Sequence, residues 1–92
     1  MSSTVSKSRV VTDHARDQWR DRSSQPWRDL TTVWSESFRI DHPAAHSGAE
    51  SFYHPPTEIV LLVQSDDVET LVTCIDLNDR CDAEQSYVRS QI

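Results

Sequence analysis

One histidine stands among several arginines in the segment VTDHARDQWRDR, which covers residues 11–22. The histidine is His14, and the arginines are Arg16, Arg20 and Arg22. A histidine can take up or release a proton near neutral pH, and a guanidinium suits a phosphate better than an ammonium does. Cleavage of RNA without a metal ion needs a base, an acid and a cation for the charge that develops on the phosphate. The segment therefore contains the side-chain types needed for chemistry on a phosphate.

A helix over residues 13–22 is expected to position these groups. Thr12 or Asp13 can cap its first turn, because both side chains accept bonds from free N–H groups. Ala15, Trp19 and Arg22 share one stripe of this helix, so Trp19 is the expected core residue. His14 and Arg22 are eight residues apart on the same side, or about 12 Å of helix rise. The alternative is a solvated face, in which aspartates at four-residue spacing pair with the arginines.

The charge is unevenly distributed along the chain. The 92 residues carry a net charge of −6, but residues 1–40 have a balance of +2 and residues 41–92 one of −8. A site for an anion is therefore expected in the first half. The chain has ten aspartates but one lysine. This composition is similar to that of halophilic, acidic proteins from high-salt cytoplasms. An ordinary acidic protein is the alternative.

Length and composition indicate one small domain in the cytoplasm. No apolar run approaches the ~20 residues that span a bilayer, and the first ten residues lack the apolar stretch of a signal peptide. No membrane partner is expected. Cys74 and Cys81 are expected to be reduced, and the serine-rich residues 1–8 to be disordered.

The remaining elements form an α+β pattern. Residues 9–11 predict a short N-terminal strand, and Pro26 is well placed to begin a second helix through residue 37. Trp27, Leu30 and Trp34 are spaced three and four apart in that helix, so all three tryptophans of the chain are expected in the core. Strands are expected at 38–40, 51–54, 58–64 and 68–77. The prediction is two helices on one face of a three- to four-stranded antiparallel sheet over residues 9–77, with 78–92 as a tail or short terminal helix.

The first helix and the order of elements resemble a known family. The run Thr12-Asp13-His14-Ala15 with its arginine-rich helix is similar to the "TxHAxxRxxxR" helix of small RelE-type toxin domains. The resemblance implies a metal-independent ribonuclease without a cofactor. It also implies RNA or the ribosome as target, and an antitoxin as protein partner.

The resemblance assigns roles by position. His14 and Arg22 match the histidine and the second arginine of the motif, while Gln18 stands where the first arginine is expected. Tyr53 lies in a strand where related domains place an aromatic or polar residue near the cleft. The implied catalytic residues are His14, Arg22 and Tyr53. The implied RNA-binding residues are Arg16, Gln18 and Arg20.

Two other interpretations remain open. The acidic second half and the glutamine in the motif favour a catalytically inert interaction or regulatory module, such as a degenerate toxin fold encoded by a virus or plasmid. A zinc-stabilised module would use His42, His46 and His54 with the two cysteines. Pro43 interrupts the histidine spacing and no CxxC motif is present, so no metal site is predicted.

Overall fold

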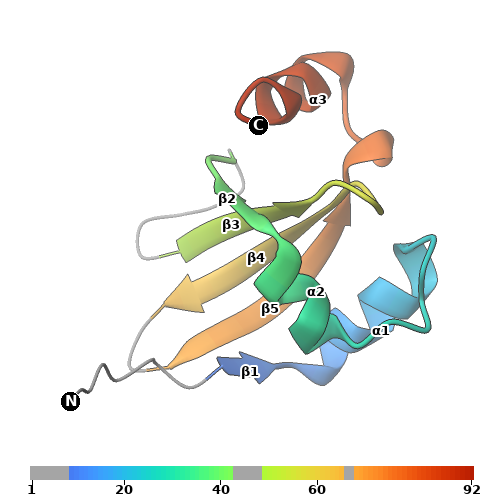
Figure 1. Ribbon diagram of the computed structural model, residues 1–92, viewed down its shortest axis with the longest axis vertical. Coiled ribbons are helices and arrows are strands. Elements are labelled where there is room, and N and C mark those ends of the chain that lie inside the picture. The colour runs from blue at the N-terminus through green and yellow to red at the C-terminus, as the bar shows by residue number, and fades with distance from the viewer. Residues whose placement is uncertain (1–8, 43–48, 66–67) are drawn as a thin grey trace.

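The computed structural model describes residues 9–42, 49–65 and 68–92, which form an α+β fold (Figure 1). The elements are, in chain order, β1 (Arg9–Val11), α1 (Asp13–Arg22), α2 (Leu30–Glu36), β2 (Phe38–Ile40), β3 (Ala49–His54), β4 (Ile59–Ser65), β5 (Glu69–Asp76), the 3-10 helix η1 (Leu77–Asp79) and α3 (Asp82–Arg89). The expected α+β class is confirmed. Residues 1–8, which were expected to be disordered, lie outside the described residues. His46, a candidate zinc ligand, lies outside them as well.

The sheet differs from the expected one in size and direction. It has five strands in the order β1-β5-β4-β3-β2, and β1 pairs parallel to β5 while the other pairs are antiparallel. The prediction of a three- to four-stranded antiparallel sheet was therefore wrong in detail. Three residues in β1 do not encode the direction of their pairing, because that direction depends on the path of the connecting helices.

Helices pack against both faces of the sheet. On one face, Trp19 of α1 and Trp34 of α2 pack over Leu61 and Leu71. On the other face, Val88 of α3 packs with Tyr53 and residues of β4 and η1. β4 is buried on both sides, as its apolar sequence predicted. A short terminal helix was one of the two alternatives for residues 78–92, but the one-face prediction did not place α3 (Asp82–Arg89) against the sheet. Figure 1 shows α3 at the opposite end of the view from α1. None of the described helices has the length and apolar character needed to cross a bilayer.

The second helix begins later than expected and leaves Trp27 outside the core. Asp29 is the N-cap of α2, and its carboxylate accepts a bond from the Thr32 N–H at 3.3 Å. The carboxylate cap therefore sets the first turn, rather than Pro26. Trp27 precedes the helix in a turn and is 77% exposed, whereas Trp19 and Trp34 are buried. The expectation that all three tryptophans lie in the core was wrong for Trp27.

Side chains of α1 complete the hydrogen bonding of β5 where β1 ends. The pairing of β1 with β5 stops at Leu71, whose carbonyl also accepts bonds from Thr12 N and Oγ1, each at 3.2 Å. Further along β5, Gln18 Oε1 accepts from the Cys74 N–H at 2.9 Å and from the Thr73 hydroxyl. Arg22 Nη1 donates to the Cys74 carbonyl at 2.8 Å. Gln18 and Arg22 thus take the place of a neighbouring strand.

Replacing Gln18 by alanine should destabilise the protein. Gln18→Ala leaves the Cys74 N–H and the Thr73 hydroxyl without their acceptor, which costs about 1–3 kcal/mol when the groups are shielded from water. The free energy of unfolding is measured by urea denaturation followed by circular dichroism. The control is Asp17→Ala, whose exposed side chain pairs with Arg20 at 3.6 Å and should change stability by less than about 0.5 kcal/mol. Equal effects of the two substitutions would contradict this account of the β5 edge.

Candidate functional site

Helix α1 distributes the predicted site residues over two flanks. Ala15 and Trp19 are buried against the sheet, and residues four apart lie on the same side of a helix. One flank carries His14, Gln18 and Arg22, and the other carries Arg16 and Arg20. The structure therefore brings the implied catalytic residues His14 and Arg22 to one flank. Of the implied RNA-binding residues, Gln18 lies on that flank, whereas Arg16 and Arg20 lie on the other.

The flank with His14 forms a shallow, open depression of about 450 Å³. His14 and Arg22 both line it, and His14 is exposed. Asp17 and Asp21 line it as well, and the Arg22 guanidinium already donates to the Cys74 carbonyl. An anion here would meet two carboxylates and one partly committed cation. The depression therefore offers a histidine to solvent, but only weak electrostatic attraction for a phosphate.

Tyr53 lies on the far face of the sheet from His14. It is 2% exposed and packs in the cluster of Val60, Leu77 and Val88. Burial raises the pKa of its hydroxyl, and a hydrogen bond with Arg89 opposes that shift. The structure does not bring Tyr53 to the surface that carries His14 and Arg22. Its catalytic role stays a prediction from the resemblance, with no support from the geometry.

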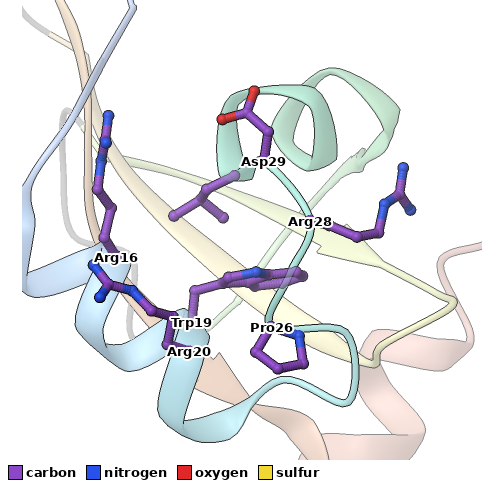
Figure 2. Close-up of a pocket in the computed structure, with 7 residues that line it drawn as sticks. Arg16, Trp19, Arg20, Pro26, Arg28 and Asp29 are labelled. Carbon is purple, nitrogen blue, oxygen red and sulfur yellow. The ribbon is translucent and has the colours of Figure 1, made fainter.

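The other flank borders a pocket of about 160 Å³, here called the arginine pocket (Figure 2). Its lining residues are Arg16, Trp19, Arg20, Pro26, Arg28, Asp29 and Leu30. Figure 2 shows Arg16 and Arg20 reaching from α1 on one side of the Trp19 indole and Arg28 on the other. The one carboxylate of the lining, Asp29, caps α2 and also accepts from the Thr32 hydroxyl at 3.1 Å. The lining is therefore rich in cations, and its acid is already hydrogen-bonded.

A chain of polar contacts runs from the arginine pocket into the protein. Arg28 Nη2 lies 2.8 Å and 2.9 Å from the two carboxylate oxygens of Glu36. Glu36 Oε1 lies 3.3 Å from His54 Nε2, and His54 Nδ1 lies 2.8 Å from Thr57 Oγ1. A neutral His54 that donates from Nε2 to Glu36 and accepts at Nδ1 from Thr57 satisfies these contacts. The chain fixes Arg28 on one side of the pocket.

The pKa values in this chain follow from its geometry. The hydrogen bond from Arg28 is the main reason why the pKa of Glu36 is lowered, and the bond with His54 adds to it. Burial lowers the pKa of His54, and this effect outweighs the neighbouring carboxylate. The His54 ring is 1% exposed and stands edge-on to the Trp19 indole at 6.1 Å between centroids. A buried carboxylate-bonded histidine thus supports the rear of the pocket.

Of the other side chains considered for metal binding, His42 and Cys74 are buried, whereas Cys81 is exposed. His42 Nε2 lies 2.9 Å from Glu84 Oε2, which also bonds Arg80. Burial raises the pKa of the Cys74 thiol to about 12, so it is not a thiolate nucleophile at neutral pH. Within residues 9–42, 49–65 and 68–92, no group of three or more metal-binding side chains is found.

Sequence reasoning did not assign Arg28, Glu36 or His54 to this site. Arg28 follows Pro26 and Trp27, and a cation beside an aromatic residue in a turn is a signal that could have been noticed. The contact of Glu36 with His54 carries no such signal. It joins a helix end to a strand end 18 positions away, and only the folded chain brings the two together.

The burial of His54 should make stability depend on pH. Because its pKa is lower in the folded protein than its ordinary value of 6.5, the unfolded chain takes up the proton first as the pH falls. The free energy of unfolding should therefore decrease from pH 6.5 down to the folded-state pKa, and the His54 contribution is complete above 6.5. His54→Gln should flatten the profile in this window, as measured by urea denaturation at a series of pH values. Parallel profiles for both proteins would contradict the assignment. The lowered pKa of Glu36 acts in a separate, more acidic window.

Comparison with known proteins places this geometry in a family. Residues 11–78 match the family model described as "Putative RelE superfamily toxin domain", a range that includes both flanks of α1 and the arginine pocket. No curated protein and no solved structure is found to match the chain. The family match covers well over half of the chain and agrees with the resemblance read from the helix around His14. The chain therefore belongs to the family of RelE superfamily toxin domains.

Proposed function

We propose that this toxin domain binds RNA and that the arginine pocket holds the phosphate backbone. The observation that carries the proposal is the position of Arg16 and Arg20, which are exposed side by side on one flank of α1 and line the same pocket. Guanidinium groups bind phosphate oxygens through charge-assisted hydrogen bonds. Membership in a toxin family supports RNA, free or on the ribosome, as the source of the phosphates.

The charges around the arginine pocket favour it as the RNA site over the depression that is lined by His14. Arg20 pairs with Asp17 at 3.6 Å, but both side chains are largely exposed. Such a pair contributes little and is screened by salt, so Arg20 can exchange Asp17 for a phosphate at small cost. Arg22 would instead have to give up a 2.8 Å bond to the backbone of β5. RNA is thus expected to bind on the Arg16 flank despite the net charge of −6.

A protein partner is a further part of the proposal. Members of this family are toxins, so a neutralising antitoxin is the class of protein expected to bind the domain. Such a partner would inhibit most directly by covering Arg16 and Arg20, because these residues line the proposed RNA site.

Removing the two exposed arginines should weaken RNA binding. The double variant Arg16→Ala/Arg20→Ala loses two charge-assisted contacts, each worth roughly tenfold in affinity. Binding of a short single-stranded RNA is measured by fluorescence anisotropy at fixed salt concentration. The control is Arg39→Ala/Arg80→Ala, which removes the same charge from β2 and from the connection between η1 and α3. Equal weakening by both double variants would indicate attraction by overall charge alone and would contradict the pocket assignment.

Cleavage of RNA through His14, in the depression on the other flank of α1, is the second candidate function. The observation in its favour is that His14 is exposed in the first turn of α1 and shares its depression with Arg22. In this proposal His14 takes the proton from the ribose 2′-hydroxyl, whose oxygen attacks the adjacent phosphorus. The bond from phosphorus to the 5′-oxygen breaks, and water protonates that leaving oxygen. Gln18 lies on the same flank, but its side-chain oxygen is occupied by β5. We therefore assign this oxygen a structural role in the proposal.

The variant His14→Ala tests this second candidate. RNA cleavage by the purified wild-type protein and by the folded variant is compared in concentrated potassium chloride, with ribosomes supplied in parallel. General-base catalysis predicts a loss of about 10²- to 10⁴-fold in rate. Undiminished cleavage by the variant would exclude His14 as the base. A wild-type protein that binds RNA and cuts neither free nor ribosomal RNA would be a catalytically inert binding module.

A further inference from the structure

Trp27 is a large aromatic side chain that the core does not use. It is 77% exposed, the highest value among the large apolar side chains that the structure describes, while Trp19 and Trp34 are 2% and 1% exposed. Because the Trp27 indole is not buried, it contributes little hydrophobic stabilisation to the fold. Indole rings left in water beside cationic groups are typical of surfaces that bind nucleic acid bases.

The turn that carries Trp27 is held by several hydrogen bonds. The Arg28 N–H donates to the Gln25 carbonyl at 3.1 Å, which closes the turn through Pro26 and Trp27. The Gln25 N–H donates to the Ser23 hydroxyl at 2.9 Å, and the Arg28 guanidinium is fixed by Glu36. The backbone on both sides of Trp27 is therefore anchored, so binding would cost little ordering of the turn.

The turn that carries Trp27 borders the arginine pocket. Its two sequence neighbours, Pro26 and Arg28, both line the pocket, as Figure 2 shows. Arg16 and Arg20 stand across the Trp19 indole from Arg28. The exposed ring thus belongs to the residue between two that line a cationic pocket.

We propose that Trp27 stacks on an unpaired base of the RNA whose phosphates occupy the arginine pocket, so that the site selects single-stranded RNA. This inference rests on the proposed RNA binding and names its substrate class. A base in a duplex is stacked between its neighbours and does not offer a face to the indole, whereas every base of a single strand does. The cationic lining of the pocket favours a nucleic acid over an apolar peptide as the occupant.

The test compares Trp27→Ala with the wild-type protein on two probes, a short oligouridylate and a short RNA duplex. Stacking on one aromatic ring predicts a loss of about tenfold in affinity for the single strand, with affinity for the duplex unchanged. The intrinsic fluorescence of the wild-type protein should be quenched by oligouridylate. Trp27→Ala should lose this quenching, because Trp19 and Trp34 are buried. The control is Phe38→Ala, which removes another exposed aromatic side chain, on β2, and should change neither affinity.

The outcomes separate this inference from the proposed function. If Trp27→Ala leaves both affinities unchanged while Arg16→Ala/Arg20→Ala lowers them, the stacking proposal is overturned and RNA binding stands, with Trp27 left as a surface for a protein partner. If Trp27→Ala lowers both affinities equally, selection of single strands is overturned. If the folded wild-type protein binds neither probe at low salt, the proposed function fails, and the inference fails with it.

Discussion

The packing of α1 against β5 is the interaction on which the rest of the structure depends. Trp19 fills the core beneath the helix, and the side chains of Gln18 and Arg22 bond the backbone of Cys74 beyond the end of β1. These contacts fix both the position and the rotation of the helix. Rotation matters most for function, because it determines which arginines support the sheet and which face solvent.

This rotation explains why a glutamine suits position 18 of the helix. At position 18 the sheet presents two donors, the Cys74 N–H and the Thr73 hydroxyl, and both point to one side-chain oxygen. A guanidinium has only donors and could not accept from the Cys74 N–H. In this chain Gln18 is therefore suited to the edge of β5. The phosphate-binding charge proposed for the first half is carried instead by Arg16 and Arg20. Arg28 is held by Glu36 on the other side of the Trp19 indole.

The sequence predicted the parts of the fold that depend on local pattern. The capped helix after Thr12, the burial of Trp19 and the doubly buried strand β4 follow from spacing and side-chain type. The parallel pairing of β1 was not predictable in this way, because three residues carry no sign of their direction. Trp27 was misplaced because the helix start was predicted at Pro26, whereas Asp29 caps α2 and the helix begins at Leu30.

The candidate site was predictable only in its residue types. The histidine and the arginines around it were evident from the segment 11–22, but their division between two flanks depends on which face of α1 is buried. Tyr53 was assigned by strand position, and the alternation of the strand turns it to the other face of the sheet. The contact of Glu36 with His54 depends on tertiary structure alone.

The most direct test of the central claim is the salt dependence of RNA binding. The dissociation constant for a short single-stranded RNA is measured over the salt range in which circular dichroism shows wild type and Arg16→Ala/Arg20→Ala to be folded. If both guanidinium groups contact phosphates, the slope of log affinity against log salt becomes shallower by about 1.4 in the variant, since each contact with a single strand contributes about 0.7. An unchanged slope would show that Arg16 and Arg20 do not contact the RNA backbone, and would contradict the assignment of the arginine pocket as the phosphate site.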